Sequence, residues 1–259
     1  MTRNIFLPLL LAGCASLPAA PTGFAAHPGF DTWRYPGDEV IASWRRATPY
    51  RWMGYYLPAP CHRDTSFSGK REYLTASGWG LAILYVGQQT FDGEPPAELN
   101  ESTLCSSILL TAEQGTKDGD DAVQRAAAEG FPPGSIIFLD LERMASVSEP
   151  MVEYYRAWVR TVLADGRYRP GTYAHVSNAA ALYTLAQRVL EEAGAAGSIP
   201  FWVAGGGGFS LNARPEDVGY PFVEVWQGAL DTPRTWGGHT LVVDENVAST
   251  PSPSAPIGE

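Results

Sequence analysis

Lysine is nearly absent from this chain. Only Lys70 and Lys117 occur among 18 lysine and arginine residues, against 28 aspartate and glutamate residues, so the formal net charge at pH 7 is −10. Proteins that bind nucleic acid, or that adhere to an anionic membrane surface through charge, need basic patches. The composition therefore argues against a nucleic-acid partner and against direct electrostatic adhesion to a membrane.

A hydrophobic run long enough to span a bilayer is also missing. The first residues instead carry one positive charge, Arg3, and then the short apolar run 5–12. This order predicts an export signal over residues 1–13. Leu11-Ala12-Gly13-Cys14 resembles the bacterial lipobox, whose cysteine is acylated and becomes the first residue of the mature chain. The alternatives are an ordinary signal peptide and a merely apolar start.

The lipobox prediction sets where the protein resides. An acyl group on Cys14 would make it an exported, membrane-anchored bacterial lipoprotein, either periplasmic or at the cell surface. Residues 14–27 are rich in alanine and proline and lack periodicity, so we expect a tether. About twelve residues extend to about 40 Å, enough to hold a domain clear of the lipid headgroups.

Cysteine is scarce, with three residues in the chain. If Cys14 carries lipid, Cys61 and Cys105 remain, and we expect them to form a disulfide in an oxidising compartment. The alternative is two free thiols. Cys61 and His62 are not expected to act as nucleophile and base, because adjacent side chains on an extended chain diverge.

Motifs of several other chemistries are missing as well. The four histidines show no metal-ligand spacing, and no Gly-x-Ser-x-Gly elbow occurs. The glycine run 205–208 lacks the lysine and hydroxyl residue of a phosphate loop. We therefore expect no metal and no cofactor.

Strand-like and helix-like runs alternate through the first two thirds of the chain. The predicted strands are 29–33, 51–57, 81–87, 135–142, 172–175, 200–204, 222–227 and 240–246, and the predicted helices are 38–47, 68–77, 120–129, 149–165 and 178–193. This order predicts an α/β fold: a single parallel (β/α)8-like TIM barrel over residues 28–247, with helices reduced or missing after the last strands. Residues 248–259, rich in proline and serine, are expected to form a disordered tail. We expect a monomer.

The apolar strand 135–142 ends in two carboxylates, Asp140 and Glu142. Because alternate side chains of a strand share a face, both project to one side, about 7 Å apart. Two charges at that distance repel by about 2.4 kcal/mol at an effective dielectric constant of about 20. One of the pair is therefore a candidate proton donor near neutral pH. The alternative is a pair of solvated acids, or of acids paired with an arginine such as Arg143.

Two more acids fall at strand ends, Asp31 on the first strand and Asp244 on the last. The first and last strands of a closed barrel are neighbours, so all four acids are expected at one mouth. Aromatic and amide side chains, Trp33 and Tyr56 among them, mark the same strand ends. They suit a carbohydrate, although core packing is the alternative for any single aromatic residue. The candidate substrate-binding residues are Asp31, Asp244, Tyr85, Gln88, Tyr173, Trp202, Trp226 and Gln227.

Six short motifs, in this order along the chain, resemble a known family. They are Gly29-Phe30-Asp31, Tyr85-Val86-Gly87-Gln88-Gln89, Phe138-Leu139-Asp140-Leu141-Glu142, Gly171-Thr172-Tyr173, Phe201-Trp202-Val203-Ala204 and Val225-Trp226-Gln227. They look like the exported glycoside-hydrolase-like TIM-barrel domain family of unknown function, which is similar to the Chalaropsis-type lysozymes. The resemblance covers residues 28–247.

The resemblance implies roles for the acids. Glu142 matches the general acid that protonates the glycosidic oxygen, and Asp140 its partner acid, which activates water or stabilises a cationic intermediate. Asp31 and Asp244 match the supporting acids. Three hypotheses remain open: a lipid-anchored hydrolase of cell-envelope glycan such as peptidoglycan, a non-catalytic glycan-binding module, and a structural envelope lipoprotein.

Overall fold

The computed structural model of the chain describes residues 26–90 and 104–256. The predicted export signal, Cys14 and nearly all of the predicted tether lie outside the described residues. Within those two ranges, every helix is too short or too polar to cross a bilayer.

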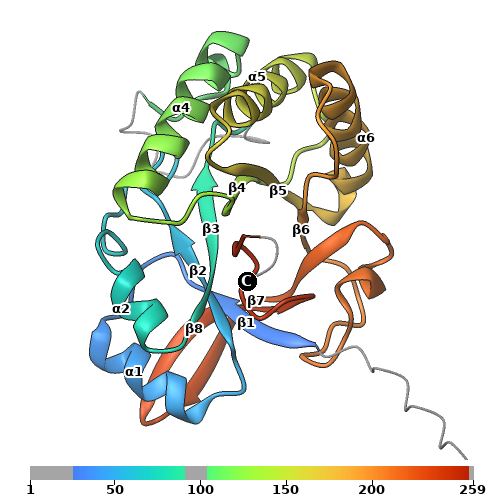
Figure 1. Ribbon diagram of the computed structural model, residues 1–259. Helices are drawn as coiled ribbons and strands as arrows, with labels where there is room; N and C mark the ends of the chain where they lie inside the picture. Colours follow the sequence, from blue (N-terminus) through green and yellow to red (C-terminus); the bar gives the residue numbers. More distant parts are fainter. Residues whose placement is uncertain (1–25, 91–103, 257–259) are drawn as a thin grey trace, which may run out of the picture.

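Eight strands close into one barrel in chain order (Figure 1). They are β1 (His27–Asp31), β2 (Trp52–Tyr56), β3 (Gly80–Val86), β4 (Ile136–Leu141), β5 (Arg169–His175), β6 (Phe201–Ala204), β7 (Val223–Trp236) and β8 (His239–Ala248). From β1 to β7 each strand pairs with the next in parallel. Every residue of β2, β4 and β6 is buried, as expected where side chains fill the interior and helices cover the outside.

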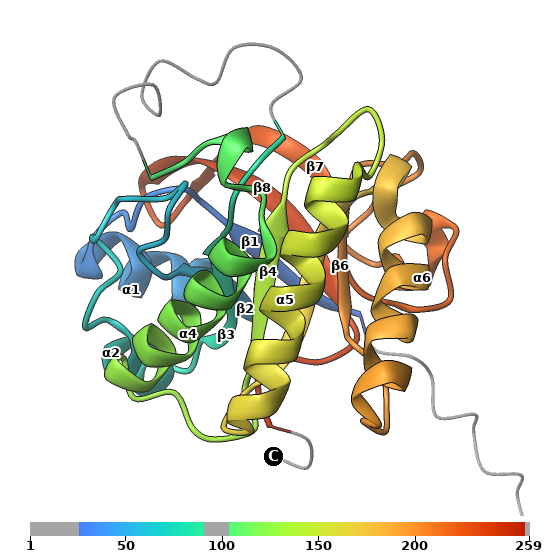
Figure 2. The same ribbon diagram turned by 90° about the horizontal axis from the view of Figure 1, so that it is seen from above.

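An α-helix follows each of the first five strands. These helices are α1 (Asp38–Ala47), α2 (Arg71–Ala76), α4 (Ala112–Ala128), α5 (Glu149–Asp165) and α6 (Val176–Ala193). Figure 2 shows α4, α5 and α6 side by side along one flank of the barrel. The connection 205–222, described throughout, contains only the 3-10 turn Pro215–Val218. The predicted α/β barrel without helices after its last strands is confirmed.

The direction of the last strand differs from the prediction. β8 runs antiparallel to both β1 and β7, so the expectation of a wholly parallel barrel is wrong at this strand. β7 and β8 are joined by Gly237 and Gly238, both with positive φ. A parallel partner needs a crossover of a dozen or more residues, whereas a two-residue turn rich in glycine makes a hairpin. The tip of this hairpin lies against α1, where Ser43 Oγ donates to Gly237 O at 2.9 Å.

Helix α4 begins at Ala112, well before its predicted start at residue 120. The side chain of Thr111 caps it by accepting the Gln114 N–H at 3.1 Å. Gly115 and Gly119 weaken the helical pattern of its first half. However, a Cβ at Gly115 would lie 2.3 Å from the carbonyl oxygen of Tyr154 on α5. Close packing of the two helices therefore requires glycine there and outweighs the local preference.

The prediction of a disordered tail over residues 248–259 is wrong for 248–256, since Ala248 ends β8 and residues 249–256 are ordered after it, and residues 257–259 lie outside the described residues. The segment crosses the amino-terminal end of the barrel and bonds to both β3 and β4. Ser254 N donates to Leu81 O at 3.0 Å, Ile136 N donates to Ser254 O at 3.0 Å, and Ile83 N donates to Ser254 Oγ at 2.7 Å. The tail therefore satisfies strand groups that β3 and β4 leave unpaired below their first shared pair, Ile83 and Ile137.

Gly80 offers a test of this tail. A Cβ at Gly80 would lie 1.9 Å from the carbonyl oxygen of Pro251, so alanine there must displace the tail. We expect Gly80→Ala to lower the free energy of unfolding by about 1–3 kcal/mol, as overpacking does. Removing residues 250–259 should itself destabilise the protein, but it should also abolish most of the added effect of Gly80→Ala. Thermal unfolding of the two variants, their combination and the wild type measures this coupling. An undiminished effect of Gly80→Ala in the shortened chain would contradict the tail contact.

Candidate active site

Four carboxylic acids converge at the carboxyl-terminal mouth of the barrel. Asp31 ends β1, Asp140 lies one residue before the end of β4, and Glu142 directly follows β4. Asp244 of β8 pairs with Asp31 across the β1–β8 ladder. Because β8 runs in the opposite direction, an acid near its middle reaches the end of the barrel at which the parallel strands finish.

Gln227 on β7 links the acids of β1 and β8. Its Nε2 donates to Asp31 Oδ2 at 2.8 Å and to Asp244 Oδ2 at 3.3 Å. Its Oε1 accepts the hydroxyl of Tyr173 on β5 at 2.7 Å. Burial first, and then the charges of all four acids, raise the pKa of Tyr173 well above its ordinary value. The structure thus brings Tyr173 and Gln227 together with the acids, where the sequence predicts them.

Asp31 has the most hydrogen bonds of the four acids. Besides the bond from Gln227, it accepts the Tyr56 hydroxyl at 2.8 Å and Asn246 Nδ2 at 2.8 Å. These donors favour the carboxylate, but burial outweighs them and raises the pKa of Asp31, with a smaller contribution from the charge of Glu142. Three donors fix its orientation, so Asp31 suits a supporting role better than proton transfer.

Asp140 has the opposite environment. It is 3% exposed, and its Oδ1 has no hydrogen-bond partner in the described part of the chain. Burial first, and then the charges of Glu142 and Asp31, raise its pKa well above the ordinary value. A carboxyl oxygen without a donor in a dry site disfavours the charged form. Burial and the neighbouring charges therefore favour the protonated form of Asp140 up to a higher pH than for an ordinary aspartate.

Glu142 and Asp244 lie closer to solvent. Glu142 is exposed and Asp244 is half-buried. Loss of hydration and then the charge of Asp244 raise the pKa of Glu142, although solvent moderates the shift because the residue is exposed. Burial and then the charge of Asp31 raise the pKa of Asp244 to about 7. The charges that shift the pKa values of these four acids come from other acids, with no arginine or lysine of the described residues among them.

A strained backbone position supports Asp244. Asp231 on β7 has a φ of 48°, a region that L residues rarely adopt. It lies where the β7–β8 register shifts, and its backbone N–H donates to Asp244 Oδ1 at 2.7 Å. Backbone outliers of this kind concentrate at functional sites. The alternating pattern of the strand does not reveal such a bulge, so sequence reasoning missed Asp231.

Two predicted substrate-binding residues of the β3 end lie outside the acid cluster. Tyr85 faces α4, where its hydroxyl donates to Asp121 Oδ2 at 3.0 Å. Gln88 is completely buried, and its Nε2 donates to Leu104 O at 2.8 Å. The expectation that they line the mouth is therefore not met. Tyr85 lies on the outward face of β3, packed against α4, so its place near the end of the strand does not bring it to the mouth.

The two predicted tryptophans are also unavailable to a sugar. Trp202 is completely buried, and its Nε1 donates to Asn246 Oδ1 at 2.9 Å. Trp226 is completely buried as well, and its Nε1 donates to Gly205 O at 2.7 Å. Both fill the core, which is the alternative role for any single aromatic. Asn246, which bonds both Trp202 and Asp31, was missed, although it lies two residues from Asp244 and so on the same strand face.

Trp33 presents an exposed aromatic ring next to this site, with 44% of the residue exposed. It packs edge-on against His62 with ring centroids 4.3 Å apart, and against Tyr56 at 5.8 Å. Burial lowers the pKa of His62 to about 4, so the imidazole is neutral at physiological pH. Because the hydroxyl of Tyr56 bonds Asp31, Trp33 stands at the rim of the acidic mouth.

Cys61 and Cys105 form the predicted disulfide, with their Cα atoms 5.0 Å apart. The bond joins the loop after β2 to the loop after β3, at the end of the barrel that carries the acids. Gln88 reinforces it, since its Oε1 accepts the Ser106 N–H at 2.9 Å. The prediction from cysteine count and compartment is confirmed.

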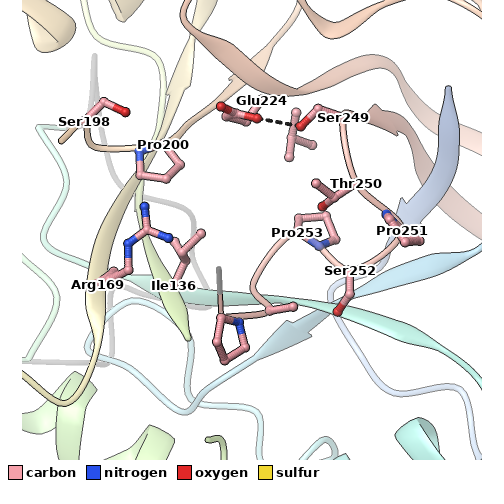
Figure 3. Close-up of a pocket in the computed structure, with 13 residues that line it drawn as sticks. Ile136, Arg169, Ser198, Pro200, Glu224, Ser249, Thr250, Pro251, Ser252 and Pro253 are labelled. Carbon is pink, nitrogen blue, oxygen red and sulfur yellow. Dashed lines mark hydrogen bonds between the residues drawn. The ribbon is translucent and has the colours of Figure 1, made fainter. Parts of the chain in front are cut away.

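A cavity of about 400 Å³ lies at the opposite end of the barrel (Figure 3). Arg169, Glu224 and the tail line it, and Ser249 of the tail donates to Glu224. None of the four acids borders this cavity. Among the residues that the structure describes, no group of three or more His, Cys, Asp or Glu side chains is arranged to hold a metal ion.

The raised pKa of Asp244 makes stability depend on pH. Its pKa rises from 3.8 to about 7 on folding, so the folded chain holds this proton more tightly, and stability falls as the pH rises from about 4 through 7. A shift of about three units corresponds to about 4 kcal/mol, which partial exposure reduces to about 2 kcal/mol. We therefore expect Asp244→Asn to be more stable than the wild type by about 2 kcal/mol at pH 8, and no more stable at pH 4.

Thermal unfolding at pH 4, 6 and 8 measures this difference. Asp120→Asn, on the exposed face of α4, is the matched control, since it removes one carboxylate that lies away from the acid cluster. A gain for Asp244→Asn that is the same at all three pH values would contradict the raised pKa.

A closed eight-stranded barrel with clustered acids at its carboxyl-terminal mouth is the arrangement expected of a glycoside-hydrolase-like barrel. A sequence profile of the Rv2525c-like, glycoside hydrolase-like domain family matches residues 42–248, and the chain belongs to this family. The match runs from within α1 to the end of β8. The predicted family resemblance is confirmed.

Solved structures share this fold. An uncharacterized protein of B. stearothermophilus aligns with a TM-score of 0.58 at 20% identity, covering 86% of this chain and 95% of that one. The spore cortex lytic enzyme SleM of Clostridium perfringens aligns with a TM-score of 0.52 at 10% identity, covering 86% and 67%. The catalytic domain of the endolysin ply40, from bacteriophage P40 of Listeria monocytogenes, aligns with a TM-score of 0.52 at 14% identity, covering 87% and 94%. A comparison with curated proteins gives no match.

Proposed function

We propose that this protein hydrolyses a glycan of the cell envelope, such as peptidoglycan, by carboxylate acid/base catalysis. The observation that carries the proposal is the convergence of four acids at the carboxyl-terminal end of the barrel. Burial first, and then the charges of neighbouring acids, raise their pKa values, and no basic side chain of the described residues is among the charges that act on them. Membership of a glycoside hydrolase-like family supports it. So does the occurrence of the same fold in a spore cortex lytic enzyme and an endolysin domain.

Glu142 is the general acid of this proposal. It is the exposed member of the cluster, so a glycosidic oxygen can reach it from solvent. Its raised pKa keeps a proton available at higher pH than an ordinary glutamate would. A positioned acid of this kind protonates the leaving oxygen and accelerates the reaction by about 10²- to 10⁴-fold.

In this proposal Asp140 acts on the attacking water or on the cationic sugar intermediate, and not on the leaving oxygen. At rest its raised pKa favours the protonated form, because burial and the charges of its neighbours disfavour the carboxylate. Positive charge that develops on the sugar favours the carboxylate. Asp140 releases its proton to solvent, and its carboxylate then either accepts a proton from the attacking water or stabilises a cationic intermediate formed with the acetamido group of the substrate. Glu142, which has given its proton to the leaving oxygen, takes up another from solvent before the next turnover.

Asp244, which is half-buried, holds a substrate hydroxyl, and its charge favours the protonated form of Glu142. Buried Asp31 supports Asp244 through the amide of Gln227, which bonds both carboxylates.

The test is digestion of purified peptidoglycan by the full chain. Hydrolysis of a glycosidic bond creates one new reducing end for each bond cleaved. We expect reducing ends and soluble fragments to accumulate with time. Saturable binding that leaves the glycan intact would contradict the enzyme and favour a non-catalytic glycan-binding module.

Lipid anchoring is the second part of the proposal. Cys14 in its lipobox would carry the acyl group and hold the barrel at a bacterial membrane, in the periplasm or at the cell surface. The Cys61–Cys105 disulfide supports an oxidising compartment. We expect a labelled fatty acid to be incorporated by the wild type in cells and to be lost in Cys14→Ser. Equal labelling of the two proteins would show that the lipid is not attached to Cys14. No labelling of either protein would contradict lipid anchoring altogether.

A further inference from the structure

The β3–β4 ladder stops just before the end of the strand that carries the two central acids. Its last pair is Val86 with Asp140, while β4 continues to Leu141. After Val86 the chain leaves the sheet, and Gln88 bonds to Leu104 and Ser106, the residues on either side of Cys105 in the disulfide loop. The edge of β4 around Leu141 therefore has no β3 backbone opposite it.

The side chain of Gln89 fills this gap. Its Nε2 donates to Asp140 O at 2.9 Å, and its Oε1 accepts the Glu142 N–H at 2.9 Å. The same Nε2 donates to Gly87 O at 3.1 Å, which ties the side chain to its own turn. Gln89 is 4% exposed, so these bonds form away from bulk water.

This arrangement reproduces one residue of a parallel sheet. In such a sheet, the N–H and C=O of one residue bond to the two residues that flank its neighbour on the adjacent strand. The single amide of Gln89 makes both bonds around Leu141, donating to the residue before it and accepting from the residue after it. It therefore stands in for the missing β3 residue opposite Leu141.

We propose that Gln89 is a positioning residue that holds the backbone of Asp140 and Glu142 in strand geometry, so that both carboxyl groups face the mouth. Its importance for catalysis rests on the proposed function. On the other side of β4 the ladder with β5 ends at Leu141 and Ala174, so Glu142 lies beyond that ladder. The Gln89 amide thus extends the strand by the one residue that carries the general acid.

Neither methionine nor ionised glutamate can make both bonds at this position. An apolar side chain of similar size, as in Gln89→Met, removes both and leaves a C=O and an N–H without partners. Glutamate, as in Gln89→Glu, keeps an acceptor for the Glu142 N–H. When ionised it cannot donate to Asp140 O, and it adds a negative charge next to the cluster.

Gln88 provides a matched control. It is adjacent in sequence and equally buried, but its amide bonds the disulfide loop, accepting the Ser106 N–H at 2.9 Å and donating to Leu104 O at 2.8 Å. The described contacts of its side chain do not include β4. Gln88→Met therefore removes the same kind of group without freeing the strand.

The first experiment is amide hydrogen exchange on the full chain, read at single-residue resolution. We expect the Glu142 N–H to be protected in the wild type, to exchange at least about tenfold faster in Gln89→Met, and to stay protected in Gln88→Met. The Ser106 N–H should show the reverse pattern. Gln89→Glu should keep the Glu142 N–H protected, and it remains informative if the methionine variant fails to fold. Unchanged exchange at Glu142 in Gln89→Met, or loss of protection in Gln89→Glu, would overturn the proposal.

The second experiment is the pH dependence of glycan cleavage. Displacing the acids by about 1 Å should lower kcat by about 10- to 100-fold in Gln89→Met, with KM little changed. In Gln89→Glu the added charge should raise the pKa of Glu142 and move the basic limb of the pH profile upward. Equal kcat in Gln89→Met and the wild type would overturn the positioning role. If neither the wild type nor any variant cleaves glycan, the proposed function fails. The exchange experiment still shows whether Gln89 holds the backbone of β4.

Discussion

Replacing Glu142 with glutamine is expected to lower glycan cleavage by about 10²- to 10⁴-fold, the contribution of a positioned general acid. Glutamine keeps the size and polarity of the side chain but holds no transferable proton. Because Glu142 is exposed and lies beyond the last pair of β4, the substitution should leave the fold and thermal stability nearly unchanged. Initial rates of reducing-end release from peptidoglycan measure the loss.

Two controls sharpen this result. Glu149→Gln removes an exposed glutamate from the first turn of α5 and should leave the rate unchanged. Binding of intact glycan to Glu142→Gln should persist, since the other acids and Trp33 remain in place. A cleavage rate equal to the wild type would remove Glu142 from the mechanism.

Removing the disulfide is expected to cause the largest change in stability. Cys61 and Cys105 are 44 residues apart in sequence, and closing a loop of that length in the unfolded chain corresponds to about 4 kcal/mol in the chain-entropy description. For a chain of this size that loss lowers Tm by roughly 8–16 °C. We expect this for the double variant Cys61→Ser/Cys105→Ser, measured by thermal unfolding.

Reductant provides the control for the disulfide. It should lower the Tm of the wild type to that of the double variant and leave the double variant unchanged. The rate of glycan cleavage at 25 °C should change little in the double variant, because the described contacts of Cys61 and Cys105 do not include the acids. The remaining link is indirect: His62, next to Cys61, packs against Tyr56. Equal Tm values for the oxidised wild type and the double variant would show that the bond does not stabilise the fold.

The acids could be predicted from sequence because their signal is local. A buried strand that ends in Asp140 and Glu142 places both side chains on one face by the geometry of the strand alone. Asp31 and Asp244 then follow from the closure of the barrel, since the first and last strands are neighbours whichever way the last one runs. Closure also explains why the prediction of the site is correct although the predicted direction of β8 is wrong: Asp31 and Asp244 are neighbours in either case.

Side chains whose positions depend on contacts between segments far apart in sequence could not be predicted in the same way. Trp202 and Trp226 lie on β6 and β7 beside true site residues, but packing, not alternation, buries them. The hydrogen bonds of Gln89 to β4 arise from a turn that brings residues 53 positions apart together. The order of the tail likewise depends on Ser254 finding unpaired groups on β3, a partner that composition cannot reveal.

The most direct test of this account is a titration of the four carboxyl groups by carbon-13 NMR, assigned through Asp31→Asn, Asp140→Asn, Glu142→Gln and Asp244→Asn. We predict that Asp244 titrates with a pKa of about 7 in the wild type, and that Asp140 is still protonated at neutral pH. The pKa of Asp244 should fall when the charge of Asp31 is removed by substitution, because the two groups face each other across β1 and β8. Four carboxyl groups that titrate independently near pH 4 would show that the acids do not share one mouth, and would contradict the proposed chemistry.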